Sequence, residues 1–68
     1  MEKRSVSLAG HRTSVALEPE FWSALERMAA RRGLSVPRLI EEMDRNSRRG
    51  NLASTIRVAI LVDLDPVP

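Results

Sequence analysis

The 68-residue chain contains no cysteine and only one histidine, His11. Disulfide frameworks and the usual Cys/His zinc sites are therefore excluded as sources of stability. A single core is marginal at this length unless a metal, a disulfide or a second subunit adds buried surface. Association with another chain is the remaining route to stability, and one domain is the upper limit.

The residues that catalysis needs are also scarce. There is no tyrosine, no glycine-rich phosphate loop and no HExxH motif, so neither a nucleophile-base pair nor a metal centre can be assembled. Glu41, Glu42 and Asp44 lie close together in the chain, and on a helix their carboxylates point in different directions. We expect no enzyme activity, no catalytic residue, no metal and no cofactor.

Long apolar runs are missing as well. The longest one, residues 58–62, is far too short to cross a bilayer, and the N-terminus carries charge without an apolar stretch. The sequence therefore predicts a soluble cytoplasmic protein.

Aromatic residues are few, whereas arginine is abundant. The one Phe and the one Trp both fall in a predicted helix, which argues against a stacking platform for single-stranded nucleic acid. Lys and Arg number 11 against 9 acidic residues, and all but Lys3 are Arg, which suits bidentate contacts to phosphate or guanine. The basic end is the front of the chain, where Lys3, Arg4 and Arg12 face only Glu2.

Residues 12–17 alternate as a half-buried strand does. Thr13, Val15 and Leu17 lie on one side, and Arg12, Ser14 and Ala16 lie on the other. A shorter alternation over residues 5–8 is separated from this strand by Gly10, which suits a bend or bulge. Residues 1–10 are accordingly expected to form either an N-terminal arm or an extra strand.

Two amphipathic helices follow, over residues 19–32 and 35–47. Pro19 suits the first helical position, and Gly33 suits a left-handed cap at the end of the first helix. Ser35 is a candidate N-cap for the second helix. The apolar stripes that predict the two helices are Phe21, Leu25, Met28 and Ala29, then Val36, Leu39, Ile40 and Met43.

A third apolar segment, residues 52–62, is predicted to be a helix that caps the core, with Asn51 able to cap its start. The β-branched run at residues 58–62 leaves a strand as an alternative, because short apolar runs cannot be assigned by periodicity alone. Residues 63–68 are predicted to be a tail that ends in Asp-Pro-Val-Pro.

The strand at residues 12–17 has no strong partner within its own chain, apart from the weak alternation before it. Backbone groups of a buried strand must be paired. The same strand from a second copy satisfies them, because two-fold symmetry brings both apolar faces together over the helices. The pattern therefore predicts a mainly α fold with a short β-ribbon, formed as an intertwined two-fold homodimer with an added C-terminal helix.

The stretch HRTSVALEPEFWSALERMAARRGLSVPRLIEEM, residues 11–43, resembles the ribbon-helix-helix family, the Arc/MetJ type of bacterial transcription factor. The resemblance rests on the alternating RTSVAL, the helical FWSALERMA, and the GLS turn before an apolar stripe, and it covers about half of the chain. It implies a dimer whose antiparallel ribbon enters the major groove of double-stranded DNA. The function it implies is transcriptional regulation.

The resemblance also implies site residues. The outward strand residues Arg12, Ser14 and Ala16 would contact bases, although Ala16 offers only a methyl group where the family usually has a polar side chain. The start of the second helix would bind a phosphate. Its implied phosphate contacts are Leu34, Ser35, Val36 and Arg38.

Two alternatives remain open. A small-molecule module on the same dimeric scaffold would hold an amino-acid-like metabolite, and Ala16 and the low net charge of +2 favour it. An antitoxin-type interaction protein is the other, with only residues 62–68 to serve as a partner-binding tail. The residues expected to line a small-molecule site are Arg4, His11 and Arg12 near the ribbon, or Asn51, Ser54 and Arg57 near the third helix.

Overall fold

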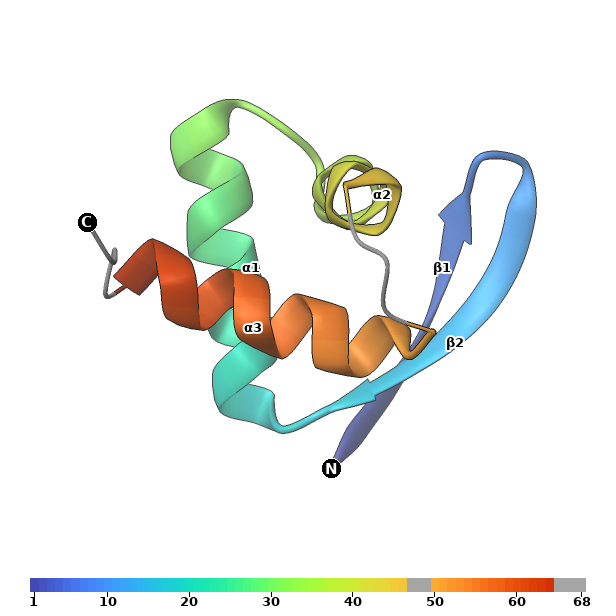
Figure 1. The fold of residues 1–68 in the computed structure, drawn as a ribbon, viewed down its shortest axis with the longest axis horizontal. Coiled ribbons are helices and arrows are strands. Elements are labelled where there is room, and N and C mark those ends of the chain that lie inside the picture. Colours follow the sequence, from blue (N-terminus) through green and yellow to red (C-terminus); the bar gives the residue numbers. More distant parts are fainter. Residues whose placement is uncertain (47–49, 65–68) are drawn as a thin grey trace.

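The computed structural model describes residues 1–46 and 50–64. A two-stranded antiparallel hairpin comes first, and three helices follow it (Figure 1). The elements are β1 (Glu2–Leu8), β2 (His11–Leu17), α1 (Pro19–Arg32), α2 (Val36–Arg45) and α3 (Leu52–Leu64).

The hairpin turns on two residues, Ala9 and Gly10. Both have positive φ, 50° and 84°, as a two-residue hairpin loop with the twist of its strands requires. The register runs from Leu8 opposite His11 at the turn to Glu2 opposite Leu17 at the open end. Gly10 therefore makes a tight reversal, and the segment before it is a full strand.

The intrachain pairing corrects the argument that β2 lacks a partner in its own chain. β1 runs beside β2 over seven residue pairs, so β2 has a partner strand in its own chain along one of its two edges. The alternation over residues 5–8 was the visible part of β1. Its first half carries Glu2, Lys3 and Arg4. Because all three are charged, this half shows no alternation of apolar and polar residues.

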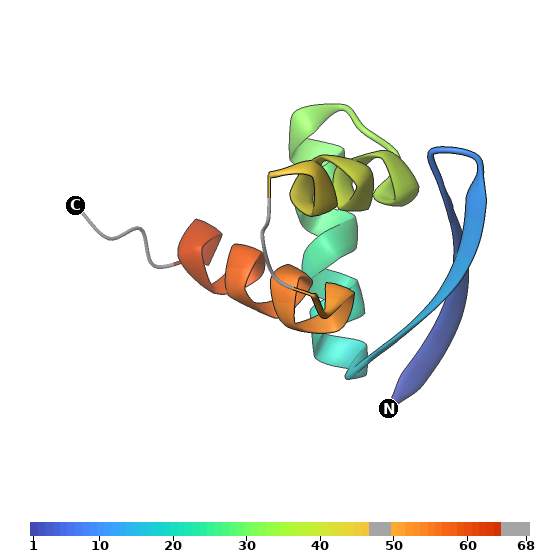
Figure 2. The ribbon, with the colours of Figure 1, turned by 45° about the vertical axis from the view of Figure 1, so that its right-hand side comes forward.

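One face of the hairpin is covered by all three helices, and the other face is open. Figure 2 shows the hairpin at one side of the molecule with the helices on its inner face only. Val6, Leu8, Val15 and Leu17 are buried on that face. They join a core to which α1 contributes Trp22, Ala24, Leu25, Met28 and Ala29, α2 contributes Leu39 and Ile40, and α3 contributes Ile56 and Ile60.

β1 is attached to α1 as well as to β2. The indole N–H of Trp22 donates to the backbone oxygen of Glu2 at 2.8 Å. The guanidinium of Arg4 lies over the Trp22 ring, 4.6 Å from its centroid, and pairs with Glu2 and with Glu26. These contacts fix the N-terminal strand in place on the helices.

The junction of α1 and α2 is a capped turn. Gly33 ends α1 in the left-handed region, with φ 67° and ψ 31°, and the N–H of Leu34 donates to the oxygen of Ala29 at 2.9 Å. Ser35 has extended backbone and caps α2 from outside the helix, because its hydroxyl accepts from the N–H of Arg38 at 3.3 Å. α2 therefore begins at Val36, one residue later than predicted, and ends at Arg45; residue 47 lies outside the described residues.

The third apolar segment is a helix, and α3 runs to Leu64, two residues beyond its predicted end. Asp63 belongs to this helix and not to a tail: its carboxylate pairs with Arg31 at 2.6 Å and with Arg32 at 3.5 Å. The cations at the end of α1 thus hold the end of α3. Residues 65–68 of the predicted tail lie outside the described residues.

Over residues 1–46 and 50–64, no helix is long and apolar enough to cross a membrane, and no group of His, Asp and Glu side chains is placed to hold a metal ion.

Gly33 gives a test of the α1–α2 junction. A Cβ atom added there meets no atom within 4 Å, so the cost of an alanine comes from the backbone conformation. We expect Gly33→Ala to lower the free energy of unfolding by about 1 kcal/mol and Gly33→Val to lower it by more, because a β-branched side chain suits positive φ least. Urea denaturation measures both. Gly50→Ala is the control, since Gly50 also has open space but no positive φ; equal melting of all three variants would contradict the assignment.

Candidate nucleic-acid interface

The outer face of β2 is the first candidate surface. Arg12 and Ser14 are exposed and Ala16 is half-buried, while Val15 and Leu17 on the opposite face are buried. The pleat of the strand produces this alternation, because successive side chains point to opposite faces. The structure therefore brings Arg12, Ser14 and Ala16 to one face, pointing away from the helices.

β1 adds three exposed side chains to the same face, Lys3, Ser5 and Ser7. The register sets Ser7 opposite Arg12, Ser5 opposite Ser14 and Lys3 opposite Ala16. These three residues were not predicted as site residues, because residues 1–10 were expected to form either an arm or an extra strand. The feature of the sequence that could have identified them is Gly10. A two-residue turn at Gly10 pairs residues 2–8 with residues 11–17 and so fixes which residues lie on the outer face.

The start of α2 is the second candidate surface, with Ser35 and Arg38 exposed and Val36 half-buried. Two of the amides near this helix start are occupied: Leu34 N–H caps α1, and Arg38 N–H donates to the Ser35 hydroxyl. The first N–H groups of any helix have no partner within that helix. The helix dipole and the Arg38 guanidinium make this end positive.

The residues expected for a small-molecule site do not come together. Arg4 is occupied by Trp22 and two carboxylates. Arg57 donates to the carboxylate of Glu18 at 2.9 and 3.1 Å, and Asn51 accepts from the N–H of Ser54 at 3.2 Å, as the cap of α3. Each of these side chains stabilises the fold, and only His11 lines the cleft described next.

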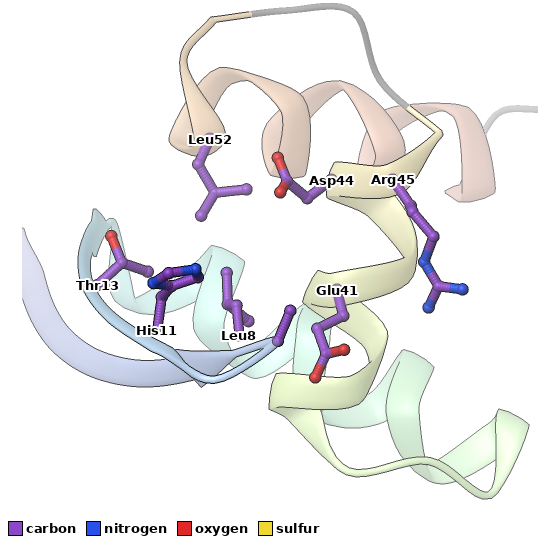
Figure 3. Close-up of a pocket in the computed structure, with 8 residues that line it drawn as sticks. Leu8, His11, Thr13, Glu41, Asp44, Arg45 and Leu52 are labelled. Atoms are coloured by element: carbon purple, nitrogen blue, oxygen red, sulfur yellow. The ribbon is translucent and has the colours of Figure 1, made fainter.

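A cleft of about 320 Å³ opens between the tip of the hairpin and α2. Figure 3 shows His11 and Thr13 on one wall and the carboxylates of Glu41 and Asp44 on the other. Its remaining lining residues are Leu8, Ala9, Arg45 and Leu52. The cleft combines apolar surface with charges of both signs, and sequence patterns could not assemble it because its walls come from distant segments.

Two titrating groups respond to their surroundings. The hydrogen bond from its own backbone and the contact with Arg57 lower the pKa of Glu18 below its usual value. Hydrogen bonds to Glu2 and Glu26 raise the pKa of Arg4 above its usual value. Both shifts favour the charged forms, so these ion pairs persist through the neutral range.

The shift at Glu18 predicts a pH dependence of stability. Because the folded-state pKa lies below the unfolded value of 4.5, Glu18 stabilises the fold above that pH, and its contribution is lost as the pH falls through the folded pKa. The free energy of unfolding of Glu18→Gln should therefore decline less steeply than that of the parent below about pH 5. Urea titrations at several pH values measure this, with Glu20→Gln, in the first turn of α1, as the control. Parallel curves for Glu18→Gln and the parent would refute it.

Comparison with known proteins gives one match. A search of curated proteins and a search of solved structures found no match. A family model described as the ribbon-helix-helix domain matches residues 1–64. Domains of this family typically bind DNA as dimers, as transcription regulators or antitoxins, and generally perform no chemistry. Since the match spans nearly the whole chain and the structure has the antiparallel ribbon followed by helices, the chain belongs to the ribbon-helix-helix family.

Proposed function

We propose that this protein is a homodimeric transcriptional regulator that places its β-ribbon in the major groove of duplex DNA. The observation that carries the proposal is the open outer face of the hairpin, where Arg12 and Ser14 stand exposed on a rigid support. The major groove is wide enough for a two-stranded ribbon. Regulation then follows from occupancy of the site, since no chemistry is required.

The two outward side chains of β2 have distinct roles in this proposal. Arg12 makes a bidentate contact to the O6 and N7 atoms of guanine, and Ser14 donates to or accepts from several base edges. Ala16 supplies a methyl contact, for instance to thymine. The start of α2, with Ser35, Val36 and Arg38, contacts a phosphate and sets the register of the ribbon on the duplex.

Dimer formation is supported by apolar surface as well as by the family. Leu61 and Leu64, near the end of α3, expose 63% and 67% of their surface, and Phe21 and Val58 lie beside them. Contiguous exposed apolar side chains favour association. Light scattering at low micromolar concentration should give about twice the chain mass of 7.6 kDa, and a folded monomer would contradict the dimer.

The DNA proposal is tested by separating base contacts from phosphate contacts. Loss of Arg12 in Arg12→Ala should cost roughly 1 to 3 kcal/mol for each bidentate contact and reduce discrimination between sites. Ser35→Ala should cost about 1 kcal/mol of stability and weaken binding similarly on all sequences. Fluorescence anisotropy with several labelled duplexes at two salt concentrations measures both effects.

The outcomes are distinct. Steep salt dependence indicates phosphate contacts, because neutralised phosphates release counterions. If the parent protein binds no duplex below about 100 μM, weaker than ordinary non-specific binding, the regulator proposal fails.

The cleft beside the hairpin tip supports a second candidate, the binding of an amino-acid-like metabolite. Its volume lies at the lower end of the range for small-molecule sites. The carboxylates of Glu41 and Asp44 suit an ammonium group, and Leu8 and Leu52 suit an apolar side chain. Calorimetry with a panel of amino acids tests it, comparing the parent with Asp44→Asn; unchanged binding in the variant, or none in the parent, would exclude this cleft.

A further inference from the structure

We infer that β1 shares the DNA-reading surface with β2, so that Lys3, Ser5 and Ser7 of β1 contact DNA beside Arg12 and Ser14 of β2. The inference rests on the proposed function and extends it to β1, which precedes the resembling stretch of residues 11–43. It enlarges the set of contact residues from one strand to two.

The register makes the two strands one surface. Ser7 with Arg12, Ser5 with Ser14, and Lys3 with Ala16 form three cross-strand pairs on the open face. Paired side chains in such a ladder lie about 5 Å apart, and successive pairs on one face are separated by about 6.8 Å. A ligand that reaches Arg12 and Ser14 from outside therefore meets Ser7 and Ser5 at the same depth.

The spacing suits duplex DNA. Base pairs are stacked about 3.4 Å apart, so successive side-chain pairs fall about two base pairs apart along the groove. Three pairs span about four base pairs. No helix of the described residues, 1–46 and 50–64, lies on this face, as Figure 2 shows, so this part of the chain leaves the surface accessible to a groove.

The chemistry of β1 supplies what β2 lacks. Ala16 brings no polar group, and Lys3 stands directly opposite it. Lys3 and Arg12 thus place one cation at each end of the ribbon, with the hydroxyls of Ser5 and Ser14 between them. Within residues 1–46 and 50–64 neither cation forms an ion pair, unlike Arg4 on the inner face.

β1 is also held firmly enough to act as a reading strand. Its inner side chains Val6 and Leu8 are buried, and Trp22 and Glu26 hold its first residues through Glu2 and Arg4. A fixed surface binds with a smaller loss of conformational freedom than a loose arm does. Lys3 is thus expected to contact a phosphate, and Ser5 and Ser7 base edges.

Site-specific crosslinking tests the inference directly. Because the chain has no cysteine, Ser7→Cys and Ser14→Cys each give a single attachment point for a photoactivated benzophenone. Both labelled proteins should crosslink to a bound duplex, whereas Ser23→Cys, on the exposed side of α1, should give only background. Circular dichroism of each labelled protein verifies that it is folded.

A charge series gives the second measurement. Lys3→Gln should reduce the salt dependence of binding, so that the fall in affinity between 50 and 200 mM salt shrinks by about 3.5-fold for each lost phosphate contact. Arg27→Gln is the matched control, because it removes one exposed cation of α1 and changes net charge equally. Its salt dependence should stay close to that of the parent.

A result that contradicts the role of β1 can be distinguished from one that contradicts the proposed function. If position 14 crosslinks and Arg12→Ala weakens binding, but position 7 gives background and Lys3→Gln behaves as Arg27→Gln, β1 is not a reading strand while the regulator proposal stands. If the parent protein binds no duplex at all, the proposed function and this inference fall together.

Discussion

The structure depends on the pairing of β1 with β2. An isolated two-stranded hairpin is marginally stable in water, so the ladder persists only because its inner face is buried on the helices. The helices in turn need that face: Leu17 and Leu25 are fully buried where the hairpin meets α1. Ribbon and helices therefore stabilise one another, and the same arrangement leaves the outer face of the ribbon free for a ligand.

Local chemistry explains how much of the fold could be predicted from the sequence. The alternation in β2, the left-handed cap at Gly33 and the N-cap at Ser35 each depend on a few adjacent residues, so they are visible without a structure. β1 was left open because its apolar signal covers only its second half. The turn at Ala9 and Gly10 decides the question, and Ala9 is not a residue that predicts positive φ.

Part of the candidate site could likewise be predicted from the sequence, and part could not. The outward direction of Arg12, Ser14 and Ala16 follows from the period of a strand, whereas the fate of the other cations depends on distant partners. Arg57 meets Glu18 across 39 positions of sequence, and Arg4 meets Glu26 across 22. No local pattern shows such pairs. Arg4 and Arg57, which were expected to bind a ligand, instead form ion pairs within the fold.

Trp22 has a practical consequence of its own. It is the only tryptophan, the chain has no tyrosine, and the indole is 1% exposed with its N–H bonded to the backbone of β1. The emission spectrum of Trp22 therefore reports whether β1 remains packed on α1. A ligand that lifts β1 from α1 would expose the indole to water and shift its fluorescence to the red, whereas one that leaves the ribbon seated would not. Trp22 is thus an intrinsic fluorescent probe of ribbon movement, and stopped-flow experiments can follow that movement without an added label.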